Sequence, residues 1–301
     1  VVPREIRHPL RYVRNLANAA RGYDAIHAHG NSATLFLEML AAKMAGVPLR
    51  IAHSHSSNCS MHLIHRIMWP LFQTLCNSRL SCSDKAGIWL FGKRDFTVIN
   101  NGIDTARFSF NAENRKDIRE MIEVTGPIVG HVGNFDYAKN HTFILQVFAE
   151  VKKTIPDAKL MLVGGGENMP KFQTMACGLG IQDSVIFTGP VSDTAPYMSA
   201  MDMVLMPSHY EGMPLTLVEE QANGLRCVVS DTITRNADLT GNLTYLSLDD
   251  PMEKWVETIA ATLNNPQDRV KTSQAAITKI KDYGYDIHQE AKKLLGCYRN
   301  R

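Results

Sequence analysis

The sequence lacks the features that mark several common classes of protein. Its 301 residues include six cysteines with no Cys-x-x-Cys pair, which argues against a disulfide framework and indicates a reduced, intracellular setting. Lysine and arginine number 32 against 30 acidic residues, so no basic excess points to nucleic acid. No apolar run is long enough to span a bilayer, and no signal-peptide pattern is evident. We therefore expect a cytoplasmic protein that binds no nucleic acid.

Further absences concern metal binding, repeats and the start of the chain. No Asp-x-Asp pair occurs anywhere, although such pairs often hold a divalent cation, and we find no internal repeat or low-complexity tract. The chain also starts without methionine, and Val1–Pro3 resembles the tail of a strand. We therefore expect that the chain is truncated at its N-terminus.

What the sequence does contain is a regular alternation of short apolar runs and amphipathic helical stretches. Apolar runs separated by helices are typical of parallel sheets covered on both faces, which predicts an α/β fold of the doubly wound, Rossmann-like kind. The predicted strands are Ala25–His29, Leu49–His53, Leu80–Cys82, Phe96–Ile99, Ile128–Val132, Leu160–Val163, Val185–Thr188, Met203–Met206, Val228–Ser230 and Leu243–Leu246.

The chain is expected to form two domains. Asn101-Gly102 is a turn signal, and the charged stretch Asn111–Glu120 is typical of an exposed helix. We divide the chain into residues 1–106 and 107–301, with a last helix at 286–301 that packs back on the first domain. Only four predicted strands fall in the first domain, so we expect it to be incomplete.

The most informative segment follows the eighth predicted strand. A polar loop carries Glu211 and Gly212, Pro214 suits the start of a helix, and that helix should span Leu215–Asn223 and end at Gly224. A helix N-terminus at the carboxyl edge of a parallel sheet offers free N–H groups and a partial positive charge. Such an edge favours binding of a pyrophosphate without a metal.

Two carboxylates flank this predicted phosphate site. Seven residues separate Glu211 from Glu219, and one carboxylate is placed to accept hydrogen bonds from sugar hydroxyls and the other from a ribose diol. The spacing and its flanks resemble the E-x7-E signature of the retaining glycosyltransferases of family 4, in particular the exopolysaccharide and capsule subgroup. The resemblance covers nearly the whole chain and implies a GT-B fold, in which two Rossmann-like domains face a central cleft.

The loop after the fifth predicted strand suits a second anion site. It begins at Gly133 and places Lys139 near a helix start, where the ammonium group offers a mobile positive charge beside the helix dipole; a solvated lysine at a helix start is the ordinary alternative. It resembles the family's G-R-x4-K motif, whose two basic residues clamp the donor diphosphate. Asn134 stands where that motif has arginine, so a bidentate contact is lost, and either weaker donor binding or a clamp made by the lysine alone is implied.

A glycine-rich turn at Gly164–Gly166 ends the next predicted strand. It hints at a dinucleotide fingerprint, but methionine occupies the third glycine position and no acidic residue follows at the expected distance. The resemblance implies instead that Gly165, together with Val191 in a later loop, lines the nucleotide pocket.

Two histidine pairs, His27-x-His29 and His53-x-His55, end the first two predicted strands. Side chains two apart share a face of a strand, so a metal site is conceivable. No acidic or cysteine cluster completes a tetrahedral set, and we predict no metal. The resemblance implies that His55 points toward the sugar, whereas a histidine that caps a loop is the ordinary alternative.

The resulting functional prediction is transfer of a hexose from a nucleotide sugar, favoured as a UDP-sugar, to a saccharide or lipid-linked acceptor with retention, in surface polysaccharide biosynthesis. No cofactor or metal is expected. Two alternatives stay open: a non-catalytic subunit that binds sugar nucleotides, and a nucleotide-sugar epimerase of the same fold. The predicted catalytic residues are Glu211, His55 and Lys139, and the predicted donor-binding residues are Gly133, Asn134, Lys139, Gly165, Val191, Glu211, Gly212, Met213, Pro214, Leu215, Thr216 and Glu219.

Two stretches combine arginines with an apolar stripe. One carries Arg4, Arg7, Arg11, Arg14 and Arg21, and the other is Ile64–Leu75 with Arg66. Basic amphipathic helices can lie on anionic lipid, which would give peripheral contact with the inner membrane face. The alternative is that the stripes pack on the protein's own core, and we favour it slightly.

Overall fold

The computed structural model describes residues 8–299, so Val1–Pro3, Arg4 and Arg7 lie outside the described residues. The chain divides into two compact units, one made of residues up to Gly102 together with the segment from Ile287 onward, and the other of Ile103–Asp286. The division expected between residues 106 and 107 therefore falls four residues earlier in the structure, and each unit is described separately below.

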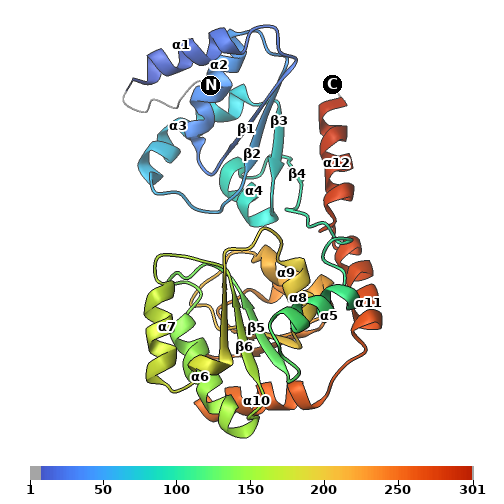
Figure 1. The fold of residues 1–301 in the computed structure, drawn as a ribbon. Coiled ribbons are helices and arrows are strands. Elements are labelled where there is room, and N and C mark those ends of the chain that lie inside the picture. The colour runs from blue at the N-terminus through green and yellow to red at the C-terminus, as the bar shows by residue number, and fades with distance from the viewer. Residues whose placement is uncertain (1–7, 300–301) are drawn as a thin grey trace. The chain divides into compact units, whose positions relative to one another are not determined.

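The first unit is built on a four-stranded sheet in the order β1-β2-β3-β4, and every pair of neighbours is parallel (Figure 1). The last strand is shorter than predicted. Its strands are β1 (Ala25–Gly30), β2 (Leu49–Ser54), β3 (Ser78–Ser81) and β4 (Thr97–Val98), and its helices are α1 (Pro9–Ala19), α2 (Phe36–Met44), α3 (His62–Leu75), α4 (Asp84–Phe91) and α12 (Ile287–Arg299).

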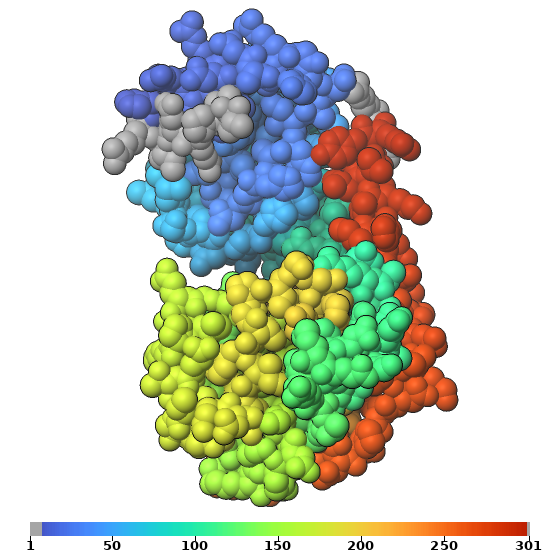
Figure 2. Space-filling view, viewed as in Figure 1, coloured from blue at the N-terminus to red at the C-terminus, as the bar shows by residue number. Residues whose placement is uncertain are grey.

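Helix α12 belongs to this first unit although it comes last in the chain. Leu294, Cys297 and Tyr298 pack against the buried residues Leu49 and Ile51 of the sheet. Figure 2 shows the helix, in red, lying against the first unit. The carboxylate of Glu290 also accepts a hydrogen bond from the backbone N–H of Asn100 at 2.7 Å.

The second unit is a six-stranded parallel sheet in the order β10-β9-β8-β5-β6-β7 (Figure 1). Its strands are β5 (Ile128–Val132), β6 (Lys159–Val163), β7 (Val185–Gly189), β8 (Met203–Met206), β9 (Arg226–Ser230) and β10 (Leu243–Leu246), and its helices are α5 (Ala112–Met121), α6 (His141–Thr154), α7 (Met169–Gly178), α8 (Ala195–Ala200), α9 (Leu215–Ala222), α10 (Met252–Asn264) and α11 (Arg269–Asp282).

Both faces of this second sheet are buried. Along β8, Met203 and Leu205 belong to one apolar cluster and Val204 and Met206 to another, because successive strand residues point to opposite faces. All four residues are 0% exposed. This burial on two sides explains why the strand is a continuous apolar run, and it confirms the predicted doubly wound α/β architecture.

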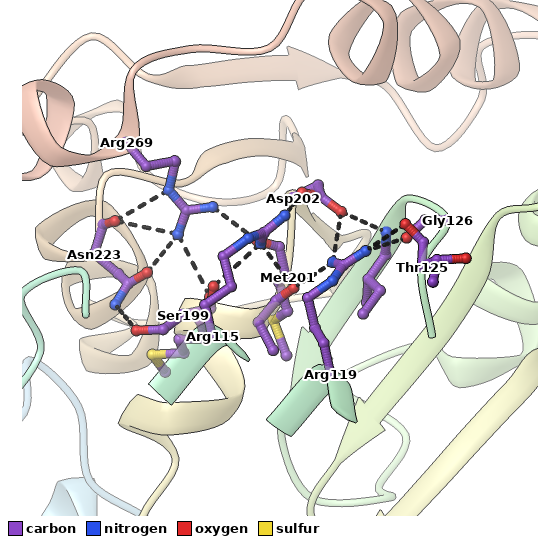
Figure 3. A network of polar contacts seen from close by, with 12 residues as sticks. Arg115, Arg119, Thr125, Gly126, Ser199, Met201, Asp202, Asn223 and Arg269 are labelled. Carbon is purple, nitrogen blue, oxygen red and sulfur yellow. Dashed lines mark hydrogen bonds and ion pairs between the residues drawn. The ribbon is translucent and has the colours of Figure 1, made fainter. Parts of the chain in front are cut away.

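A network of arginines fastens helix α5 to the rest of the second unit (Figure 3). Arg115 donates to the carbonyl oxygens of residues 199, 200 and 201 at the end of α8, and to Asp202 at 2.6 Å. The same carboxylate accepts from Arg119 and, at 2.7 Å, from the backbone N–H of Ile128 at the start of β5. Charged donors thereby satisfy helix-end carbonyls that would otherwise have no partner.

Within the described residues, no helix combines the length and the apolar character that crossing a membrane requires. Helix α1 uses its apolar stripe internally, since Val13 and Ala17 are buried against Ala41 of α2. Helix α3 differs, because Leu63, Ile67 and Leu71 are 72%, 66% and 58% exposed and follow one another at intervals of four residues.

Candidate functional site

The order of strands in the second unit points to one place on its sheet. Successive strands run outward in one direction from β5 through β6 to β7, and in the other direction from β8 through β9 to β10. The strand order reverses between β5 and β8, and ligands of open parallel sheets bind outside the carboxyl ends of the strands at such a switch point. The loop that leaves β5 there carries Gly133, Asn134 and Lys139, and the loop that leaves β8 carries Glu211, Gly212, Met213 and Pro214.

The loop after β5 is held close to the neighbouring loop after β6. The backbone N–H of Gly133 donates to the carbonyl of Val163 at 2.9 Å, and that of Phe135 donates to the carbonyl of Gly165 at 2.9 Å. A Cβ added at Gly164 would lie 2.2 Å from the Gly133 carbonyl oxygen, and the φ of +134° at Gly164 favours glycine as well. These glycines therefore let two backbones meet.

A hollow of about 500 Å³ opens beside these loops. Asn134 and Gly165, both predicted to bind the donor, line this hollow together with Gly166, Glu167 and Pro190. The Asn134 side chain is exposed at its mouth. Val191, from the loop after β7, packs instead against the apolar core.

Lys139 and Glu211, 72 residues apart, meet at the switch point. The Lys139 ammonium Nζ lies 2.6 Å from Glu211 Oε1, and the two side chains are only 15% and 14% exposed. The Ser208 hydroxyl donates to the same carboxylate oxygen at 3.1 Å. The two loops are also joined through their backbones, since the N–H of His209 donates to the carbonyl of Ala138 at 2.8 Å. A cation and an anion are thus held side by side at the expected ligand edge.

Helix α9 begins immediately after this ion pair. Its N-cap, Pro214, provides no side-chain hydrogen bond, so the N–H groups of Leu215 and Thr216 have no side-chain cap. Met213 packs on the core and Gly212 is exposed in the approach loop. The positive end of this helix dipole follows Glu211, the partner of Lys139, by four residues in the chain and suits a bound anion.

The end of this helix also follows the prediction. Gly224 has φ +76°, the left-handed conformation of a helix C′ residue, and a Cβ there would lie 2.7 Å from the backbone nitrogen of Ser273. Gln221 supports the same region, because its side-chain amide bonds the backbone carbonyl of Ala237 at 2.8 Å and the backbone N–H of Leu239 at 3.0 Å.

The second predicted carboxylate, Glu219, lies within α9 and is partly buried. Burial raises its pKa to about 7, Arg107 opposes this rise, and Asp193 adds to it. Arg107 and Asp193 form an exposed ion pair of 2.9 Å. A carboxyl group with such a pKa is poised between its neutral and charged forms near pH 7, and a perturbation of this kind is common at functional sites.

The next residue, Glu220, was not predicted to belong to the site. Its side chain is 0% exposed, and neither carboxylate oxygen has a hydrogen-bond partner among residues 8–299. Burial, and after it the charge of Glu219, raise the pKa of Glu220 well above its usual range. A signal was present, because Glu220 stands three residues after the buried Leu217 and three before the buried Asn223, on the core face of the helix.

His55 belongs to the first unit and lies among other histidines. Its ring Nε2 is 2.7 Å from Nδ1 of His29, and both side chains are exposed. The structure therefore brings Lys139 together with Glu211, and Asn134 with Gly165. His55, by contrast, lies in the first unit and directly follows β2.

Comparison with known proteins gives a consistent result. Residues 113–279 match the family model described as Glycosyl transferases group 1. EpsF of Bacillus subtilis (strain 168), a protein named as a glycosyltransferase, is 33% identical over 308 residues, with 97% of this chain and 79% of EpsF covered.

Two more distant relatives extend this result. The UDP-Gal:alpha-D-GlcNAc-diphosphoundecaprenol alpha-1,3-galactosyltransferase of Escherichia coli is 29% identical over 231 residues, with 69% of this chain and 58% of that enzyme covered. The crystal structure of HepE from Anabaena in complex with UDP has a TM-score of 0.76 at 18% identity and covers 95% of this chain and 81% of its own. That likeness confirms the expected GT-B fold.

Proposed function

Because this chain belongs to the group 1 glycosyltransferases, we propose that it transfers a hexose from a UDP-sugar to a saccharide or lipid-linked acceptor with retention, in surface polysaccharide biosynthesis. The observation that carries the proposal is the contact of Lys139 with Glu211 beside the N-terminus of α9. The UDP complex of HepE supports the choice of nucleotide, and the E. coli relative, which is named for a lipid-linked acceptor, supports that class of acceptor.

The donor diphosphate is proposed to occupy the space at the positive end of α9. Lys139 would then contact the phosphate as well as Glu211, and Asn134 would donate a hydrogen bond from the opposite loop. As the bond between the sugar and the phosphate breaks, its electron pair stays on the phosphate oxygen, and these groups stabilise the added charge. The helix and the lysine supply this charge, so we propose that the transfer step needs no metal.

The three carboxyl and imidazole groups divide the remaining roles in this proposal. Glu211, once shared between Lys139 and the ligand, accepts hydrogen bonds from the sugar hydroxyls, and Glu219 accepts them from the ribose diol. His55 stays a proposed sugar-facing residue on resemblance alone.

A donor screen followed by product analysis tests this function. Thermal shift with UDP-, GDP- and ADP-sugars identifies the nucleotide, and nuclear magnetic resonance of the product of an active pair reports the anomeric configuration. We expect a UDP-sugar to stabilise the protein and the product to retain configuration. Donor binding without turnover on any lipid-linked or saccharide acceptor would favour a non-catalytic subunit, and recovered donor with an altered sugar would favour an epimerase.

We also propose peripheral contact with an anionic membrane through α3. Its exposed residues Leu63, Ile67 and Leu71 form an apolar stripe, and Arg66 lies beside them with an exposed side chain. A helix of this kind inserts its apolar side into the headgroup region while the basic side chain stays at the surface. Such docking would bring the enzyme to a lipid-linked acceptor.

A further inference from the structure

Four imidazole rings gather at the carboxyl ends of β1 and β2 in the first unit. The two strands are parallel with His29 directly opposite His53, and residues two apart share a face of a strand. His27 and His29 are stacked with ring centroids 4.1 Å apart, and His53 and His55 follow at 4.3 Å. The register of β1 against β2 therefore brings the two histidine pairs together in a compact cluster. Neither pair alone predicts this register.

The nitrogen atoms of this cluster are spaced as metal ligands are. His27 Nε2 lies 3.1 Å from His53 Nδ1, and one nitrogen each from His27, His29 and His53 fall within 4.8 Å of one another. Two imidazole nitrogens bound at about 2.0–2.1 Å to a tetrahedral zinc ion are about 3.3 Å apart. A small inward movement of the rings would complete a three-nitrogen site.

We propose that His27, His29 and His53 bind a divalent transition-metal ion of the zinc class. Imidazole is a preferred ligand for zinc, copper and nickel, and three histidines suffice when the fourth position is left to water or another group. His55, beside His29, stands where it can take that fourth position. The three proposed ligands lie in a different unit from the switch-point loops, and none of them has a role in the proposed transfer reaction.

The side chain behind His27 meets a second requirement of such a site. A metal-bound histidine almost always donates its other ring N–H to an oxygen, which fixes the tautomer and the ring orientation. The Tyr298 hydroxyl lies 2.6 Å from His27 Nδ1, on the side of the ring away from His53. Tyr298 belongs to α12, so the ion would also tie this C-terminal helix to the sheet of its unit.

The cluster is open to solvent on one side. The exposed side chains of His29 and His55 give an ion a route from solvent.

The test uses the whole chain without a histidine tag. After dialysis against a chelator, Zn²⁺ is titrated in competition with a chromogenic chelator, and Co²⁺ is titrated separately to read geometry from its visible spectrum. We expect one Zn²⁺ per chain and a four-coordinate Co²⁺ spectrum. His29→Gln, which changes an exposed side chain, should weaken binding by about 100-fold or more, and the exposed His62→Gln, outside the cluster, should leave it unchanged.

Tyr298→Phe separates a positioned metal site from a loose group of histidines. Loss of the oxygen behind His27 should weaken Zn²⁺ binding by about 10- to 100-fold while the ligands themselves remain. Lys139→Ala, in the other unit, should bind Zn²⁺ normally even if it binds no donor. The proposal is overturned if the unaltered chain binds no Zn²⁺, or if His29→Gln binds it as well as the unaltered chain does. In either case the four rings form a hydrogen-bonded chain only.

Discussion

Affinity for a UDP-sugar should rise with pH through neutrality, and Glu219→Gln should abolish that rise. The pKa of Glu219 is raised to about 7 in the free protein. If the ribose diol donates hydrogen bonds to this side chain, the donor binds the charged form and expels the proton. The diphosphate of a sugar nucleotide is fully ionised in this range, so the pH dependence belongs to the protein.

The size of the effect follows from that pKa. With a midpoint near pH 7, about one molecule in eleven is ionised at pH 6 and about ten in eleven at pH 8. The dissociation constant should therefore fall about tenfold between pH 6 and pH 8. His131 and His141, the buried histidines near Lys139, do not contribute, because burial lowers the pKa of His141 to about 4 and that of His131 well below its usual range.

Titration calorimetry in two buffers of different ionisation enthalpy measures the protons released on binding. At pH 7 we expect about half a proton per donor for the unaltered chain and none for Glu219→Gln. Arg107→Gln removes a positive charge that lowers the pKa of Glu219, so the midpoint of the pH dependence of donor binding should move to higher pH. Asp193→Asn removes a negative charge that raises this pKa, so the midpoint should move to lower pH. Tight donor binding with no proton release and no pH dependence would refute the assigned role of Glu219.

Further outcomes follow from the same contacts. Lys139→Ala should nearly abolish diphosphate binding by calorimetry and Asn134→Arg should tighten it, and weaker binding by Asn134→Arg would mean that the loop has been rebuilt around asparagine. Asp202→Ala removes the carboxylate that two arginines and the backbone N–H of Ile128 share as an acceptor, so chemical denaturation should show a loss of about 1–3 kcal/mol, and an unchanged free energy of unfolding would contradict the role of the network. Sedimentation with anionic vesicles should show salt-sensitive binding that is weakened by Arg66→Gln and not by Arg14→Gln, and no binding at low salt would exclude docking through α3.

Much of the fold could be predicted because buried strands and helix faces require apolar residues at regular positions in the sequence. All ten predicted strands are present in residues 8–299, and the fully buried strand β8 is a continuous apolar run. The end of α9 could also be predicted, because Gly224 adopts the left-handed conformation that its position requires. Strands and helix ends depend on residues that are close together in the chain, so the sequence is enough to predict them.

Features that depend on which strands are neighbours could not be predicted from the sequence in the same way. The direct bond between Lys139 and Glu211 needs β5 and β8 to be adjacent, and the histidine cluster needs the register of β1 against β2. The charged helix α5 was predicted to be exposed, and it has no fully buried residue, yet Arg115 reaches from it into the network around Asp202. Long side chains make such contacts without altering the apolar pattern.

The location of the donor site is the central claim, and hydrogen exchange of backbone amides with and without a UDP-sugar tests it most directly. We expect slower exchange in residues 133–140, in the glycine turn at 164–166 and at the start of α9, with little change in β1 and β2. The control is Lys139→Ala, which should lose this protection at the same donor concentration. Protection confined to other segments of the second unit, with these loops exchanging as fast as in the free protein, would contradict the account.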